Sequence, residues 1–327
     1  MLRIELIGNE ALKTSAIEGE ILNRDSLQSS LRRQFGLGDD DRHIPAKERG
    51  IAEMMVTLYQ TFAEPLDTAQ LFEWHKMVMA GERHIEAIGG YRTHAEPMQI
   101  VSGSVGKSKV HFEAPPSSQV PGEMARFIDW FNDTSPGGKS PLPPLTRSGL
   151  VHIYFESIHP FEDGNGRIGR ALSEKALAQG IGQPSLISLA HTIERSRKQY
   201  YDMLELNSRD FDVTRWLTFF ADKTLEAQQI TLARANFYIA KARFYDRAGD
   251  QLNERQAKVI ARMFREGIDG FKGGLSAENY ISITQTSRAT ATRDLHELVE
   301  MGALLRTGER RYTRYWLNIE TGQKTHL

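Results

Sequence analysis

The chain has 327 residues, more than a single hydrophobic core usually serves, so two or three structural units are expected. Its 40% hydrophobic and 25% charged residues are typical of a globular protein, and no run approaches the ~18 apolar residues of a membrane helix. The absence of cysteine excludes disulfides and thiolate metal sites, and without a secretion signal at the N-terminus a cytoplasmic protein is expected. A formal net charge of −1 means that any nucleic-acid surface must be local.

The first part of the chain is predicted to be helical, with one β-hairpin. Helix formers with few breakers fill residues 8–34, which predicts one or two small helices, and residues 46–63 and 67–80 indicate further helices. Between Gly89 and Pro116, the β-prone runs MQIV and KVHF surround a Gly/Ser-rich centre, which predicts a hairpin. Helical patterning resumes at Leu145, after a loop rich in proline and glycine.

The C-terminal part is predicted to form a separate unit behind a long helix. Residues 222–247 are polar and free of glycine and proline, which indicates a connecting helix. The segments that follow show three helical patterns, at 252–267, 276–284 and 287–302. Residues 303–319 then indicate two strands that flank a glycine-containing turn. This order is typical of a winged helix-turn-helix module. The expected fold class is therefore mainly α, with a helical core that carries one hairpin and a C-terminal winged-helix-like module.

The segment HPFEDGNGRIGR combines the groups that a phosphate site needs. Its first residue, His159, can act as a base near neutral pH, and Asp163 can hold a divalent cation. The glycines at 164 and 166 let backbone amides approach an anion at what should be the start of a helix. Two arginines on neighbouring turns of that helix can grip phosphate oxygens with forked donors: Arg167 and Arg170. Together these residues predict a site for nucleotide phosphates.

Two other interpretations of the same segment fit less well. Gly164, Gly166 and Gly169 satisfy the dinucleotide-binding pattern GxGxxG, but no buried strand precedes them and no βαβ alternation surrounds them. Glu156-x-x-His159 resembles half of a di-metal carboxylate site, but a second segment of this kind is missing. The nucleotide phosphate site therefore remains the leading interpretation.

Residues 159–170 match without a gap the signature HxFx(D/E)GNGRxxR, and the chain therefore resembles the Fic domain family. The similarity extends from about Ala46 to Ala221 and includes GGYR before the hairpin and RSRKQYYDML at 195–204. Fic domains are helical with one hairpin, in agreement with the elements expected above. The resemblance implies a protein nucleotidyltransferase that uses ATP and Mg²⁺ to move AMP onto a Ser, Thr or Tyr hydroxyl. Phosphocholine or UMP transfer stays open on the motif alone.

By this resemblance, His159 would be the general base that takes the proton of the target hydroxyl, and Asp163 would bind Mg²⁺. The expected nucleotide-binding residues are Gly164, Asn165 and Gly166 as an anion nest, and Arg167 and Arg170 at the β and γ phosphates. Tyr200 and Tyr201 would either stack on adenine or pack in the core. The hairpin near residues 98–113 corresponds to a flap that holds the protein target by adding a strand.

A shorter motif lies near the N-terminus. Thr14-x-x-x-Glu18-Gly19 matches the sequence (S/T)xxxE(G/N), which marks an inhibitory helix in many Fic proteins. A carboxylate against Arg170 would occupy the donors that the γ-phosphate needs and would repel that phosphate. The resemblance thus implies self-inhibition by Glu18. In some relatives the same glutamate supports removal of AMP from targets, so transfer and removal both stay open.

The expected winged-helix-like module carries a local excess of arginine. Arg288 and Arg293 stand beside small hydroxyl residues suited to a DNA major groove, and the wing is expected to contain Arg306, Arg310, Arg311 and Arg314. Winged helices also dock proteins or form dimers. DNA contact, protein docking and a homodimer therefore all stay open.

These patterns divide the chain into four regions: 1–45 with the inhibitory helix, 46–221 as the catalytic core, 222–250 as a linker helix and 251–327 as the winged-helix-like module. Two functions of different class fit this organisation. The first is a self-inhibited AMP transferase that binds ATP and a protein target and has no membrane partner. The alternative is a DNA-binding transcription regulator whose Fic-like core senses nucleotide without turnover.

Overall fold

The computed structural model describes residues 2–38, 43–102, 109–207 and 212–319. The chain divides into two compact units, Met1–Gln228 and Gln229–Leu327. The helix α10 (Thr214–Ala248) runs through this division. Within the described ranges, no helix is both long and apolar enough to span a membrane.

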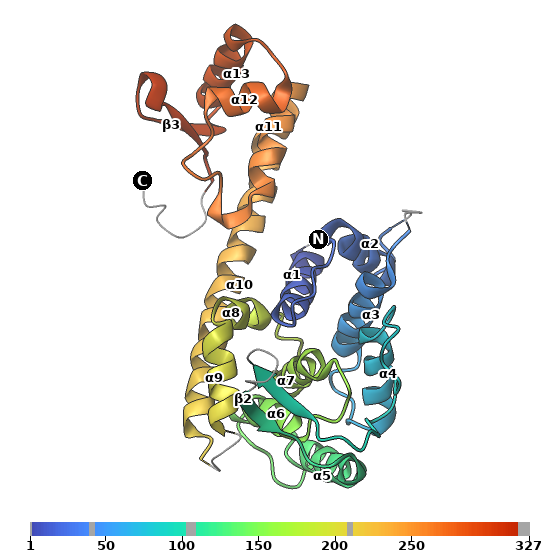
Figure 1. Cartoon of the computed structure of the whole chain (residues 1–327). Coiled ribbons are helices and arrows are strands. Elements are labelled where there is room, and N and C mark those ends of the chain that lie inside the picture. Colours follow the sequence, from blue (N-terminus) through green and yellow to red (C-terminus); the bar gives the residue numbers. More distant parts are fainter. Residues whose placement is uncertain (1, 39–42, 103–108, 208–211, 320–327) are drawn as a thin grey trace. The chain divides into compact units, whose positions relative to one another are not determined.

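The first unit consists of helices and one hairpin (Figure 1). Its helices before α10 are α1 (Leu2–Ile17), α2 (Arg24–Gln34), α3 (Ala46–Gln60), α4 (Thr68–Val78), the short η1 (Ser117–Gln119), α5 (Val120–Asp133), α6 (Pro144–Ile158), α7 (Asn165–Ile181), α8 (Leu189–Arg195) and α9 (Arg197–Asn207). The strands β1 (Gln99–Ser102) and β2 (Lys109–Glu113) pair antiparallel, as predicted. The prediction of a mainly α fold with one hairpin is confirmed.

Helices α6 and α7 pack closely in the middle of this unit. The Ser148 hydroxyl of α6 donates to the Ser173 carbonyl of α7 at 2.8 Å. Gly169 is required at the crossing, because a Cβ there would lie 2.7 Å from Oε1 of Glu156. Proline in the first turn starts α6, and Gly182 in the left-handed conformation ends α7. This pair holds the loop that carries the phosphate-site motif.

Helices α1 and α5 differ from the sequence expectation. Helix α1 begins at Leu2, six residues before the expected segment, because Ile4, Ile7 and Ala11 form a buried face at helical spacing. No element was expected between Pro116 and residue 133, yet α5 lies there and buries Val120, Met124, Phe127 and Phe131. Their spacing of three or four residues is the helical signal.

The second unit contains three main helices followed by a hairpin, in the predicted order. After the short η2 (Gly249–Gln251) come α11 (Glu254–Arg265), η3 (Gly267–Asp269), α12 (Ala277–Thr284), α13 (Arg288–Glu300), β3 (Leu304–Thr307), η4 (Arg310–Tyr312) and β4 (Arg314–Leu317). The strands pair antiparallel, and Leu275 adds a bridge to Tyr315. Phe264, Tyr280 and Leu295 are buried in its core.

Candidate active site

The backbone of His159 is held in an unusual conformation between α6 and α7. With φ 50° and ψ 59°, His159 lies in the left-handed region, which costs a non-glycine residue about 1 kcal/mol. The buried Arg92 fixes this conformation, because its Nε donates to the His159 carbonyl at 2.8 Å and its backbone N–H donates to the Pro160 carbonyl at 2.9 Å. Arg92 also donates to the Ser117 hydroxyl beyond the hairpin, so it joins the histidine to the base of the flap.

The His159 ring faces a buried carboxylate. Its Nδ1 lies 3.5 Å from Oε2 of Glu156, one turn earlier on α6. Although burial opposes ionisation of Glu156, contact with His159 and the nearby His152 and Arg170 hold the pKa of its carboxyl below the ordinary value. Glu156 is therefore ionised, and its carboxylate lies within ion-pair distance of the histidine. From the sequence, Glu156 was considered only as part of a metal pattern that lacks its second half.

The loop after His159 is closed by its own side chains. Asn165 exchanges two hydrogen bonds with the Phe161 backbone, at 2.9 and 2.8 Å. The Asn165 side chain therefore stabilises the loop that carries the predicted anion nest, and its amide is not available to bind an anion. Gly164 has φ 81°, and α7 begins directly after it, so the first amides of that helix are the donors that the predicted nest would offer.

His75 supports the loop from α4. Its ring stacks on Phe161 with 4.1 Å between centroids, and its Nδ1 accepts from the Gly89 amide at 2.9 Å. Burial lowers the pKa of His75 to about 4, although Asp163 opposes this shift. A neutral imidazole can act as this acceptor, whereas an imidazolium cannot.

The Arg170 guanidinium is buried, and its Nε and NH2 groups are engaged by the end of α1. It donates to Oε1 of Glu18 at 2.7 Å, to the Thr14 hydroxyl at 2.7 Å and to the Thr14 carbonyl at 2.9 Å. Burial disfavours the cation, but Glu18 reverses this and raises the pKa of Arg170 above its ordinary value. The carboxylate also lies over Gly166, where a Cβ would be 2.2 Å from Glu18 Oε1. Glu18 thus covers the start of α7.

Arg167 is engaged by a second carboxylate that the sequence analysis missed. Its NH1 donates to Oε2 of Glu20 at 2.9 Å, and the other oxygen of Glu20 lies 3.0 Å from Nζ of Lys47. Gly19, with φ 86°, turns the chain after α1 and brings Glu20 to this position. The short segment from Glu18 to Glu20 therefore supplies one carboxylate to each arginine of the motif.

The predicted metal ligand, Asp163, is the most accessible of the motif's charged groups. Its side chain is 54% exposed, and Oδ1 lies 3.4 Å from NH2 of Arg167. Among the described residues, no group of three or more His, Cys, Asp or Glu side chains is arranged to hold a metal ion.

The two candidate adenine-stacking tyrosines differ in environment. Tyr200 is 1% exposed and its hydroxyl bonds to Nε2 of His152 at 2.8 Å, so it packs in the core. Tyr201 is partly exposed, and its hydroxyl lies 3.5 Å from Oε2 of Glu18. Only Tyr201 therefore borders the site. Residues 103–108 of the flap lie outside the described residues, so target binding by the flap stays a prediction.

Residues 65–177 match the model of the Fic/DOC family, and residues 1–37 match a domain of unknown function (DUF4172). Over 149 residues the chain is 31% identical to the protein adenylyltransferase Fic of Drosophila willistoni and 30% identical to that of Drosophila melanogaster. The match covers 44% of this chain and 26% and 27% of those proteins. The chain thus spans about a quarter of the length of these curated relatives.

Solved structures share the fold. A Fic family protein from Desulfovibrio desulfuricans G20 has a TM-score of 0.54 at 22% identity, over 96% of this chain and 87% of that one. A Fic domain containing signaling protein from Bacteroides thetaiotaomicron VPI-5482 has a TM-score of 0.52 at 20% identity, over 68% of this chain and 85% of that one. These similarities support the helical fold independently of the motif.

Proposed function

Because the chain contains a Fic/DOC family domain, we propose that it is a protein adenylyltransferase, which moves AMP from ATP onto a Ser, Thr or Tyr hydroxyl of a protein target. The observation that carries the proposal is the loop between α6 and α7. It combines a histidine beside a carboxylate, a helix N-terminus whose first amides have no partner within the helix, and two arginines. The relatives from Drosophila, which bear the name protein adenylyltransferase, support the same activity.

In this proposal, His159 is the general base. The oxygen of the target hydroxyl forms a bond to the α-phosphorus of ATP, its proton passes to His159, and the bond to the bridging oxygen breaks to release pyrophosphate. The carboxylate of Glu156, 3.5 Å from Nδ1, favours the tautomer with the proton on that nitrogen. The other ring nitrogen, Nε2, then accepts the proton of the target.

The phosphates are bound by the first turn of α7. Amides at the start of this helix, its dipole, Arg167 and Arg170 all favour anions there. Asp163 fits a Mg²⁺ ligand, because one exposed carboxylate together with nucleotide phosphates is a usual environment for this ion. When bound, Mg²⁺ supplies positive charge that offsets the charge on the phosphates.

The segment after α1 inhibits the enzyme. Glu18 and Glu20 engage Arg170 and Arg167 at 2.7 and 2.9 Å, so they compete with phosphate oxygens for the same donors. A carboxylate over the anion nest also repels a triphosphate. The protein is therefore an adenylyltransferase held in an inhibited state by two carboxylates.

The C-terminal unit fits a winged helix-turn-helix module. Helices α12 and α13 are separated by residues 285–287, with Gln285 in the left-handed conformation, and the β3–β4 hairpin follows as the wing. The alternative function, a regulator with a non-catalytic core, is not favoured, because the motif is complete and the curated relatives are named as transferases.

Incubation with labelled ATP and Mg²⁺ tests the proposal. The variant Glu18→Gly should place label on itself or on proteins of a lysate, and Glu18→Gly with His159→Ala should not, while both bind ATP with similar affinity. Label on the His159→Ala protein would refute the base assignment. ATP binding without any protein label in either variant would favour the non-catalytic alternative.

A further inference from the structure

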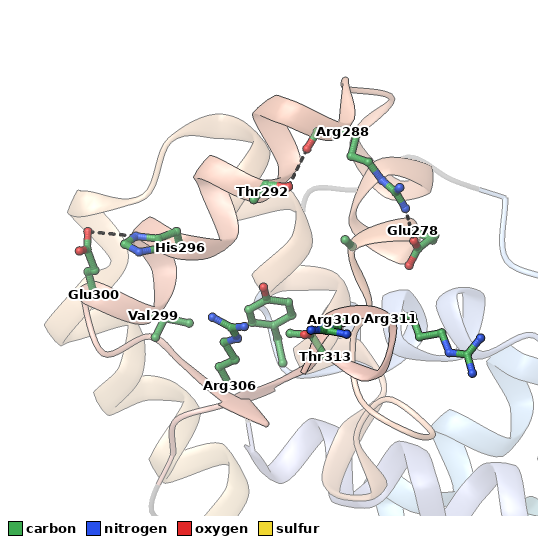
Figure 2. A pocket seen from close by; sticks show the side chains of 12 residues that line it. Glu278, Arg288, Thr292, His296, Val299, Glu300, Arg306, Arg310, Arg311 and Thr313 are labelled. Carbon is green, nitrogen blue, oxygen red and sulfur yellow. Dashed lines mark hydrogen bonds and ion pairs between the residues drawn. The ribbon is translucent and has the colours of Figure 1, made fainter. Parts of the chain in front are cut away.

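A groove of about 580 Å³ opens in the second unit between α13 and the β3–β4 hairpin (Figure 2). Val299 and Tyr315 are among the residues that line it. Arginines and other polar side chains extend from its two walls: Arg288, Thr292 and His296 from α13, and Arg306, Arg310 and Arg311 from the hairpin and its turn. The groove lies wholly within this unit.

The two walls differ in how their charges are balanced. On α13, Arg288 pairs with Glu278 at 2.6 Å, and His296 lies 3.4 Å from Glu300. On the hairpin side, the three arginines are exposed, and none has a carboxylate partner among the residues that the structure describes. Three uncompensated guanidinium groups therefore line one wall, which favours an anion with regularly spaced charges.

Both walls of the groove are fixed by contacts within this unit. The buried Asp294 of α13 accepts from Nε of Arg255 at 2.7 Å and from the Tyr280 hydroxyl at 2.9 Å, so it ties α13 to α11 and α12. In the wing, Gly308 has φ 71°, and a Cβ there would lie 2.4 Å from the Tyr312 carbonyl oxygen. The arginines are thus presented from a rigid helix and a tight turn, which lowers the entropic cost of binding.

The exposed face of α13 carries small side chains, so another molecule can approach the helix closely. Ala289 and Thr292 are small and exposed beside the charged Arg293. A helix of this kind fits the major groove of B-form DNA, which is about 12 Å wide, whereas the major groove of duplex RNA is too narrow. From the charge and shape together, we propose that this surface binds duplex DNA, with α13 in the major groove and Arg306, Arg310 and Arg311 on the phosphodiester backbone.

The test measures how salt weakens DNA binding by the 327-residue chain. Each phosphate contact contributes about 0.9 to the slope of log affinity against log salt, so three arginines predict about a 40-fold loss between roughly 50 and 200 mM salt. The double variant Arg306→Gln, Arg310→Gln should keep only about a 3- to 4-fold loss from the third arginine. Fluorescence anisotropy of a labelled mixed-sequence duplex provides the measurement.

Matched variants separate charge from folding. Arg265→Gln removes one exposed charge of α11 outside the groove and should leave the slope unchanged. Arg306→Lys with Arg310→Lys keeps the charge and should keep most of the slope. No binding at low salt, an unchanged slope in the double glutamine variant, or equal affinity for duplex RNA would overturn the proposal. Tighter binding of polyglutamate than of DNA would also overturn it, in favour of protein docking.

Discussion

Removal of the two carboxylates after α1 should raise the proposed AMP transfer. Glu18 occupies Arg170 at 2.7 Å, and Glu20 occupies Arg167 at 2.9 Å. A hydrogen bond to a charged group contributes about 1.5 to 3 kcal/mol, and each 1.36 kcal/mol changes a rate about tenfold. Glu18→Gly should therefore raise AMP transfer by about ten- to one-hundredfold.

Glu20→Gln should have a smaller effect. Glu20 is shared between Arg167 and Lys47, and Asp163 keeps its own contact with Arg167 when Glu20 is neutral. A gain of about three- to tenfold is expected. Because the two carboxylates engage different arginines, the double variant should gain about the product of the two effects.

Transfer of labelled AMP at equal protein concentration measures these effects. Glu18→Ala controls for the flexibility of glycine, and Glu73→Gln on α4 controls for removal of one exposed carboxylate. Glu18→Gly with Arg170→Ala should lose the gain, because the freed donor is absent. If Glu18→Gly is no more active than wild type on itself and on lysate proteins, the inhibitory role of Glu18 is wrong. If Glu20→Gln behaves like the Glu73 control, its pair with Arg167 is only structural.

Two further predictions concern buried carboxylates. Glu156→Gln should slow AMP transfer about tenfold or more without changing ATP affinity, since it orients His159 and contacts no phosphate; a parallel loss of ATP affinity in calorimetry would contradict this. Burial raises the pKa of Glu174 to about 7 from 4.5, so its stabilising effect is complete below pH 4.5 and is lost as the pH rises through 7. As the pH rises from 4.5 to 7, the free energy of unfolding should fall by up to roughly 3 kcal/mol more in wild type than in Glu174→Gln. Urea titrations at several pH values measure this difference. The same pH dependence in both proteins would exclude the raised pKa.

The sequence revealed the groups of the site that are close together along the chain. His159, Asp163 and the two arginines lie within one loop and one helical turn, so their spacing alone predicted a phosphate site. The helical core and its hairpin were likewise predicted, because periodicity and turn residues are local signals. The contact from Glu18 to Arg170 spans 152 positions, and it was expected only because a second motif marked one end of it.

The supporting contacts were not predicted, because no local pattern marks them. Arg92 was known only as part of the GGYR run, and its bond to the His159 carbonyl depends on how the flap packs beside α6. Glu20 reaches Arg167 because Gly19 adopts a positive φ and turns the chain, while Lys47 on α3 holds its other oxygen. Asn165 was expected in the anion nest, but the bonds of its amide to the Phe161 backbone were not predicted, since the partner is a backbone group. Such contacts follow from packing, and a single sequence does not report packing.

Relief of inhibition should leave α1 docked. Ile4, Ile7 and Ile17 are at most 5% exposed, and exposing each would cost about 1.5 to 3 kcal/mol, so undocking costs more than one carboxylate contact. Glu18 and Glu20 lie beyond the last residue of α1, on either side of Gly19, and their side chains are 26% and 16% exposed. ATP is therefore expected to displace the two carboxylates by a rotation of this short segment. Hydrogen exchange with mass spectrometry should show unchanged protection of α1 in Glu18→Gly with ATP, together with faster exchange at residues 18–23. Faster exchange along α1 itself would show that the whole helix leaves, and the rotation would then be the wrong mechanism.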